Sequence, residues 1–215
     1  MKKGCICEGI IEKVEFPNRG KATVEGETVI VKNGIPGQKV RFVINKKRGK
    51  RLEGRLLEVL EKSPLERREP VCSVFPDCGG CMYQTMPYEE QLKMKQAQVK
   101  EILDRAVLGE YEYENIYGSP QGIKGSPREF AYRNKMEFSF GDAEKDGPLT
   151  LGLHKKGSTY DVLTAGDCQL VHQDMTKILT CVWEYFRDRK VSYYKKMQHV
   201  GYLRHLLLRR GTTTG

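Results

Sequence analysis

The first sixty residues alternate between short apolar runs and turns, a pattern that predicts a series of short β-strands. Four glycines divide this region into runs rich in valine and isoleucine: Gly20, Gly26, Gly34 and Gly37. Turn signals at such short intervals are typical of strands joined by hairpins. Because no helical pattern interrupts the strands, we expect an OB-like β-barrel over residues 1–62, whose closure would leave no free strand edge.

Beyond a charged, proline-containing linker at residues 63–71, helical and strand patterns are mixed. Within residues 87–109, apolar residues recur at the spacing of one helix face: Leu92, Val99, Ile102, Leu103 and Ala106. Residues 111–165 return to strand patterns, and a second amphipathic helix follows His172. The sequence therefore predicts an α+β protein, in which the barrel is followed by a mixed α+β central domain over residues 72–215.

The chain carries an excess of positive charge, since 37 Lys and Arg against 28 Asp and Glu give a net charge of +9. Such an excess favours a polyanionic partner, most often nucleic acid. Many of the cations cluster at a predicted hairpin: Arg41, Lys46, Lys47, Arg48, Lys50, Arg51 and Arg55. We predict that they bind RNA phosphates; the alternative is a loop that is simply solvated.

Arg133 and Lys135 alternate along a later predicted strand and form a second candidate RNA-binding pair. The alternative for both cations is ion pairing with Glu129 or Glu137. The sequence "HKKG" at residues 154–157 predicts a hairpin turn, and we expect its two lysines to be solvated.

No stretch approaches the roughly 18 consecutive apolar residues of a membrane span, and the N-terminal segment lacks the apolar core of a secretory signal. We therefore expect a cytoplasmic protein without membrane contact, and the sequence indicates no obligate protein partner. Seven cysteines in a reducing compartment favour metal binding or redox chemistry over disulfides.

Three of the cysteines, Cys72, Cys78 and Cys81, are crowded into one short segment with a glycine pair before the last. Gly79 and Gly80 lack a Cβ atom, so the backbone there can take positive φ and turn sharply around a metal centre. Three thiolates converging in this way predict a metal site that needs one further ligand.

Cys168 is the best candidate for that fourth ligand, because it lies in a loop just before the second helix. Cys5 and Cys7 belong to the predicted barrel, and Cys181 falls on the helix away from its apolar stripe. A triplet with one remote cysteine favours a [4Fe–4S] cluster, whereas structural zinc usually takes two close pairs of ligands. The remaining alternative is a set of ordinary buried thiols.

Four segments together resemble the uridine-C5 RNA methyltransferases, specifically the iron–sulfur-containing 23S rRNA type: "CSVFPDCGGCMYQ", "AYRNKMEFSFG", "GDCQLV" and "LRHLLLRRGTTTG". The first sixty residues are similar to a TRAM domain, which is an OB-like RNA-binding barrel. The resemblance implies a [4Fe–4S] cluster on Cys72, Cys78, Cys81 and Cys168, and a central domain that holds RNA. It also implies 23S rRNA as the partner, S-adenosylmethionine as the methyl donor and uracil C5 as the acceptor.

In such enzymes a cysteine thiolate adds to C6 of a flipped uracil, C5 attacks the methyl sulfonium, and a base removes the C5 proton. The family's Rossmann-like catalytic domain lies beyond residue 215, so we expect it to be absent, with no catalytic and no cofactor-binding residue in this chain. The fragment alone is expected to be inactive. The helix at residues 87–109 packs with that domain in the family, so we expect its apolar stripe to be disordered, repacked or buried in a neighbouring copy.

Two other functions fit parts of the sequence. A zinc-stabilised RNA-binding module would share the basic barrel and the cysteines, and would differ only in its metal. A small iron–sulfur redox protein would share the cluster, but such carriers are often acidic and usually lack a basic barrel. The net charge therefore favours the RNA-binding part of a methyltransferase.

Overall fold

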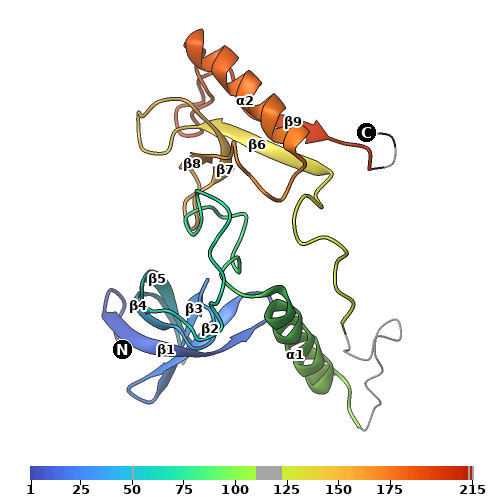
Figure 1. Ribbon diagram of the computed structural model, residues 1–215. Helices are drawn as coiled ribbons and strands as arrows, with labels where there is room; N and C mark the ends of the chain where they lie inside the picture. The colour runs from blue at the N-terminus through green and yellow to red at the C-terminus, as the bar shows by residue number, and fades with distance from the viewer. Residues whose placement is uncertain (50, 110–122, 213, 215) are drawn as a thin grey trace. The chain divides into compact units, whose positions relative to one another are not determined.

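The computed structural model describes residues 1–49, 51–109, 123–212 and 214, which fall into two compact units (Figure 1). The first unit comprises Met1–Glu69 and Thr85–Gly125, and the second comprises Pro70–Gln84 and Ser126–Gly215. Each unit is therefore assembled from two separate segments of the chain.

The first unit contains a closed barrel of five strands. In chain order they are β1 (Ile6–Glu15), β2 (Arg19–Val24), β3 (Glu27–Lys32), β4 (Lys39–Arg48) and β5 (Arg51–Glu61). Around the barrel the order is β1-β2-β3-β5-β4. Strands β3 and β5 are parallel, and the other neighbouring strands are antiparallel. The prediction of a closed OB-like barrel from the glycine spacing is confirmed.

The barrel interior is filled by side chains that alternate along the strands. Val29, Phe42, Ile44 and Leu52 are each at most 1 % exposed. Gly54 on β5 makes room for the largest of them, because a Cβ atom at this position would lie 2.6 Å from Cδ2 of Phe42. A glycine inside a strand here reflects close packing against a ring rather than a turn.

The residues predicted as a linker are folded against the barrel. Glu66 organises this segment, because its carboxylate accepts hydrogen bonds from Gln38 Nε2 (2.9 Å), Ser63 N (2.8 Å) and Thr85 Oγ1 (2.9 Å). The residue Ser63 is buried. A network of buried polar groups whose members are paired fixes the backbone that carries them. The first part of residues 63–71 is therefore an extension of the barrel rather than a free connection.

Helix α1 (Tyr88–Ala106) packs on the barrel through Met94, which lies against the barrel core, and through polar side chains. The Gln98 side chain is buried, and its Nε2 donates a hydrogen bond to the carbonyl oxygen of Val14 at 2.9 Å. Near the other end of the helix, Arg105 contacts the carboxylate of Glu15 at 2.8 Å. These contacts join the helix to the end of β1.

The position of α1 differs from the expectation. The sequence assigns the helix to the central domain, with its apolar stripe disordered, repacked or covered by a neighbouring copy, whereas the helix is ordered and groups with the barrel. Val99 and Ile102 of the stripe are 37 % and 45 % exposed. The stripe of apolar residues failed to indicate the docking face, because Gln98 and Met94, which are not part of that stripe, contact the barrel.

The second unit is a four-stranded antiparallel sheet with one helix. The strands are β6 (Lys135–Gly141), β7 (Thr150–His154), β8 (Val162–Thr164) and β9 (His205–Arg209), in the order β8-β7-β6-β9. Figure 1 shows α2 (Gln173–Asp188) lying along the sheet. Neither described helix is long and apolar enough to cross a membrane.

The two faces of this sheet differ in character because side chains alternate along each strand. Phe138 on β6 is fully buried in a core that includes Met175 and Leu179 of α2. Lys135 and Glu137, which alternate with it, are exposed on the opposite face. The mixed α+β architecture predicted for the second half of the chain is therefore present, with a polar sheet face available for binding.

Candidate functional site

The four cysteines predicted as metal ligands line one small pocket in the second unit, which we call the cysteine pocket. Cys72, Cys78 and Cys81 come from the segment before α1, and Cys168 comes from the loop before α2. All four are free thiols. The other three cysteines lie elsewhere, because Cys5 and Cys7 belong to the first unit and Cys181 is exposed on α2.

The segment that carries the cysteine trio is fastened to the end of β7. The amide of Gly79 donates to the carbonyl oxygen of His154 at 2.9 Å, and the amide of Lys156 donates to that of Asp77 at 2.7 Å. A Cβ atom on Gly79 would lie 3.0 Å from the same His154 oxygen, and one on Gly80 would lie 3.1 Å from Cδ1 of Leu153. The glycine pair is thus explained by close approach to β7.

This explanation corrects the expectation from the sequence. Neither Gly79 nor Gly80 is among the described residues with positive φ, so the segment does not use the backbone freedom that the sequence suggested. The glycines serve instead to let two segments of backbone touch, which is a second common reason for glycine near a site.

Cys168 is held near the trio by a contact between the two segments of the unit. The amide of Ser73 donates a hydrogen bond to Oδ2 of Asp167 at 2.9 Å, although the two residues are 94 positions apart in the chain. The amide of Cys168 donates to the carbonyl oxygen of Ala165, which closes a tight turn. Asp167, the residue that precedes Cys168, therefore holds this fourth thiol at the pocket.

Burial dominates the electrostatics of these thiols. It raises the pKa of Cys72, Cys78 and Cys168, because the charged thiolate is less well solvated inside the pocket. Backbone amides oppose that shift, and the amide of Gly80 lies 3.3 Å from Sγ of Cys78. Three thiols are thus arranged to accept a hydrogen bond from the amide two residues later, at residues 74, 80 and 170.

Lys156 lies beside the pocket rather than in solvent. Burial lowers the pKa of this lysine, and the neighbouring Cys78 and Cys81 oppose the shift. Its Nζ also lies 5.2 Å from the centre of the Phe75 ring. The expectation of a solvated hairpin turn at residues 154–157 is wrong for this side chain, because the cysteine segment covers it.

The thiols as they stand do not form a site for one ion. Among the described residues, no three side chains of His, Cys, Asp or Glu are arranged to hold a metal ion. Four sulfurs around one zinc, each at about 2.3 Å from it, would be separated from one another by about 3.8 Å. The pocket therefore gathers four soft donors, and the described residues do not form a ready-made site for a metal ion.

The cations predicted to bind RNA in the first unit lie on the hairpin of β4 and β5, which we call the basic hairpin. Its members within the described residues are Arg41, Lys46, Lys47, Arg48, Arg51 and Arg55, whereas Lys50 lies outside them. Arg41 contacts Glu8 and Glu58, each at 2.8 Å, so its charge is largely compensated. Glu53 lies between Lys46 (3.6 Å) and Arg51 (3.1 Å).

The tip of the basic hairpin keeps uncompensated charge. Arg48 lies opposite Arg51 in the strand pairing, and both are exposed. Arg48 and Arg55 make no ion pair with any described residue. Surface ion pairs such as those of Glu53 stabilise little and exchange readily with phosphate. The hairpin tip therefore remains a candidate RNA contact, while Arg41 is a weaker one.

Arg133 and Lys135 are both exposed in the second unit. Lys135 pairs in register with Arg209 of β9, so two cations stand side by side on the polar sheet face. Glu137, one of the two carboxylates expected to neutralise them, contacts His205 at 3.7 Å. The position of Lys135 is compatible with phosphate binding.

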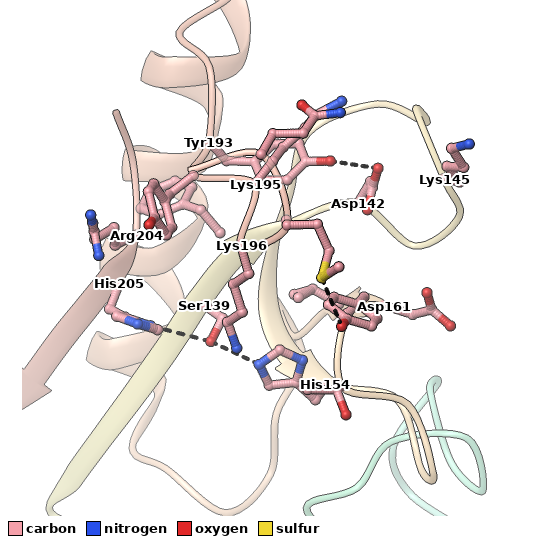
Figure 2. Close-up of a pocket in the computed structure, with 18 of the residues that line it drawn as sticks. Ser139, Asp142, Lys145, His154, Asp161, Tyr193, Lys195, Lys196, Arg204 and His205 are labelled. Carbon is pink, nitrogen blue, oxygen red and sulfur yellow. Dashed lines mark hydrogen bonds between the residues drawn. The ribbon is translucent and has the colours of Figure 1, made fainter. Parts of the chain in front are cut away.

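Sequence reasoning missed a larger pocket in the second unit, which we call the tyrosine pocket. Its volume is about 420 Å³, and Figure 2 shows the side chains that line it. The lining comes from β6, β7, β8, the start of β9 and three irregular segments at residues 142–146, 159–161 and 193–198. The sequence "YYKK" at residues 193–196, in which aromatic rings adjoin cations, is the signal that could have indicated it.

Comparisons with known proteins identify relatives over the whole chain. It is 42% identical to an uncharacterised RNA methyltransferase from Clostridium tetani and 39% identical to one from Caldanaerobacter subterraneus subsp. tengcongensis. The chain is similar to RNA methyltransferases. It covers 45% and 46% of these two proteins, so it spans less than half the length of the curated relatives it matches. No family model matches the chain.

A solved structure shares the fold. The tRNA (uracil-54, C5)-methyltransferase of Pyrococcus abyssi, determined in complex with S-adenosyl-L-homocysteine, superposes with a TM-score of 0.64 over 96% of this chain and 43% of its own. The two sequences are 22% identical, so the likeness establishes the fold alone. The barrel and the α+β unit predicted from the sequence are thus an arrangement that a methyltransferase contains.

Proposed function

We propose that this chain is the N-terminal, RNA-binding part of an S-adenosylmethionine-dependent RNA uracil-C5 methyltransferase. The observation that carries the proposal is the 42% identity that extends over all 215 residues to a protein named RNA methyltransferase. The exposed cations of the basic hairpin and of the β6–β9 face support an RNA partner. A cytoplasmic location belongs to the same proposal, since RNA substrates and reduced thiols are found there.

Methyl transfer itself is assigned to a part of the protein outside these residues. The uracil-C5 reaction needs a thiolate nucleophile, a general base and a site for the methyl donor. The cysteines of the cysteine pocket have burial-raised pKa values at three positions, which is the opposite of an activated nucleophile. We therefore expect the 215-residue chain to bind RNA without methylating it.

The proposed cofactor of the chain is a [4Fe–4S] cluster held by Cys72, Cys78, Cys81 and Cys168. Four soft sulfur donors from two segments suit iron–sulfur ligation, and backbone amides directed at three of the sulfurs would stabilise their negative charge. When bound, the cluster would join the two segments by metal–sulfur bonds. The half-buried Lys156 would compensate part of the added charge.

A structural role is the simplest for this site. Methyl transfer from a sulfonium requires no electron, so the chemistry gives the cluster no step of its own. Joining Cys81 to Cys168 would close a long loop, and closing long loops stabilises the folded state. Zinc is the alternative metal, because four cysteine thiolates are also the ligands of structural zinc sites.

Metal analysis separates the two cofactors. After anaerobic purification, we expect absorbance near 400 nm together with iron and acid-labile sulfide in equal amounts. Zinc in place of iron would support the zinc-stabilised RNA-binding module instead. A chain that contains neither metal after anaerobic purification would contradict both.

The RNA target is proposed to be 23S rRNA, on the resemblance of the cysteine motif and its companion segments. A decisive test is to delete the encoding gene in the source organism and to map 5-methyluridine in its rRNA and tRNA. Loss of one modified position in 23S rRNA is the expected result. Loss of a tRNA position would keep the enzyme class and change the substrate, and loss of none would overturn the proposed function.

A further inference from the structure

The tyrosine pocket has the dimensions of a small-ligand site. Its volume of about 420 Å³ lies within the range of about 300–1,000 Å³ that is usual for ligand pockets. It opens on the polar face of the sheet, where Ser139 of β6, His154 of β7 and His205 of β9 form its floor (Figure 2). The three residues come from strands that are adjacent in the sheet, so the floor is rigid.

The floor presents alternating hydrogen-bond donors and acceptors. Oγ of Ser139 lies 3.3 Å from Nε2 of His154 and 3.3 Å from Nδ1 of His205 (Figure 2). A neutral imidazole has one donor and one acceptor nitrogen, and a hydroxyl can serve as both. A nucleobase edge also carries donors and acceptors side by side, so this row of groups can pair with one.

Aromatic rings form the wall above that floor. The hydroxyl of Tyr193 donates to Oδ2 of Asp142 at 2.6 Å, which fixes the ring, and burial together with this carboxylate raises the pKa of Tyr193. The guanidinium of Arg204 lies 3.6 Å from the centre of the Tyr194 ring. Tyr160, on the facing segment, is 56 % exposed. Tyr193 and Tyr194 are half-buried, so the exposed ring of Tyr160 is the one that offers a stacking surface to an unpaired base.

The rim of the pocket carries one more cation than carboxylates: Lys145, Lys195, Lys196 and Arg204 against Asp142, Asp146 and Asp161. Lys195 contacts Asp146 at 2.7 Å, and Asp142 is occupied by Tyr193. Lys145 and Lys196 form no ion pair with any residue in the described part of the chain. A phosphate group at the rim would therefore meet free ammonium groups.

The exposed face of the sheet extends from the tyrosine pocket along β6 and β9. Ser139 and Lys135 are four residues apart on β6, which corresponds to about 13 Å. Along the neighbouring strand, the paired residues are His205 opposite Ser139 and Arg209 opposite Lys135. Cations thus stand at both ends of an exposed path on β6 and β9, at a spacing that a short length of RNA backbone can follow, and the carboxylate of Glu137 between them lies 3.7 Å from His205.

We propose that the tyrosine pocket holds one unstacked nucleotide of a single-stranded RNA segment, whose backbone continues over β6 and β9 toward Lys135 and Arg209. This inference rests on the proposed function and adds to it a specific place where one base is bound. An intact duplex cannot insert a base into a pocket without first breaking a pair. The bound RNA is therefore a loop or an unpaired strand, and the pocket contributes to the choice of that loop.

The test compares two double variants by fluorescence anisotropy with a labelled single-stranded 12-mer of uridylate. Replacing Tyr160 and Lys196 by alanine removes a stacking ring and a rim cation. Replacing Tyr185 and Lys177 by alanine removes a tyrosine that is 50 % exposed and an exposed lysine from α2. We expect the pocket variant to raise Kd at least fivefold, on the order of one lost base stack, and the control to change Kd less than twofold.

Competition and cross-linking complete the test. Uridine 5′-monophosphate should compete only at concentrations far above those of the 12-mer, and a perfect duplex should be insensitive to the pocket variant. An RNA that carries 5-iodouridine should cross-link to the peptide that contains Tyr193 and Tyr194. Equal competition by the mononucleotide would show a site for a free nucleotide and overturn the proposal.

The outcomes keep the two proposals apart. If the pocket variant binds like the wild-type chain while charge reversal in the basic hairpin weakens binding, the inference is wrong and the proposed function stands. If the wild-type chain binds none of the RNAs, the proposed function fails and the inference fails with it. Thermal unfolding of each variant verifies that a loss of binding does not reflect a loss of fold.

Discussion

The two units offer a partner different kinds of surface, and the contrast shows how function could be encoded in each. In the first unit a closed barrel surrounds an apolar core, and its charge lies on an exposed hairpin. The second unit, built on an open sheet, contains the cysteine pocket and the tyrosine pocket, whose linings come from residues far apart in the chain. Exposed charge gives affinity for any RNA, whereas a shaped pocket can choose among them.

The units also differ in what stabilises them. The barrel closes every strand edge and fills its interior with side chains such as Phe42 and Ile44. The second unit instead relies on Ser73 and Asp167 to bring two distant segments together, and its four thiols meet at that junction. We therefore expect the second unit to depend on a bound metal centre and the first unit not to.

The largest effect should follow from breaking the cysteine pocket. Cys78→Ser should abolish iron binding and destabilise the second unit by at least about 2 kcal/mol, as loss of a long-range cross-link does. Hydrogen exchange resolved by peptide should show faster exchange over Ser126–Gly215 and unchanged exchange over the barrel. The matched control is Cys181→Ser on α2, which should keep its iron. Unchanged iron content in Cys78→Ser would refute the ligand assignment.

Charge reversal at the tip of the basic hairpin should have the next largest effect. Replacing Lys47, Arg48 and Arg51 by glutamate should lower the slope of log Kd against log salt by about 2, because each phosphate contact contributes about 0.7–0.9 to it. Unlike the pocket variant, this change should weaken binding of single strands and duplexes alike. The control reverses three exposed lysines elsewhere: Lys62, Lys177 and Lys190. An equal slope in the hairpin variant and the wild type would show that the hairpin does not meet RNA.

A smaller effect should come from overpacking the barrel core, which should lower the stability of the first unit without changing the iron content of the cysteine pocket. Gly54→Ala places a Cβ atom 2.6 Å from the Phe42 ring, and such overpacking costs about 1–3 kcal/mol. Urea unfolding should show this loss in the first unit while the iron content stays constant. Gly166→Ala is the control, because its Cβ atom would lie at an ordinary 3.5 Å from Thr180. Equal stability of both variants would contradict the packing argument.

The smallest effect should appear on acidification. Hydrogen bonds from Lys21 and then from Arg105 lower the pKa of Glu15 from 4.5 to about 2. Because the folded state holds the carboxylate ionised, this contribution to stability is present above pH 4.5 and is lost as the pH falls toward 2. Thermal unfolding of the wild type should therefore lose stability over that interval relative to Glu15→Gln. A constant difference between the two across the interval would mean that the ion pair does not form in solution.

The sequence predicts those features that depend on local spacing. Glycine intervals predicted the closed barrel, and the crowded cysteines with a loop cysteine before a helix led to the four residues of the cysteine pocket. In each case the relevant residues either lie close in the chain or belong to a rare type. Cysteine is scarce enough that Cys168 could be chosen by excluding the other three candidates.

Features that depend on packing between distant segments could not be predicted. The docking of α1 rests on Gln98, a polar residue that no apolar period marks. The tyrosine pocket takes Ser139, His154 and His205 from separate strands, and ordinary residue types at such separations give no pattern. The glycine pair predicts a sharp turn, whereas its close approach to the His154 carbonyl depends on where β7 lies in the folded unit.

Because the second unit consists of two separate segments of the chain, it cannot fold until both have been synthesised. Pro70–Gln84 leaves the ribosome long before the partner segment Ser126–Gly215. At elongation rates of about 5–20 residues per second, the delay between Cys81 and Cys168 is on the order of ten seconds. During that interval the barrel can already close, while three nascent thiols stay open to their surroundings.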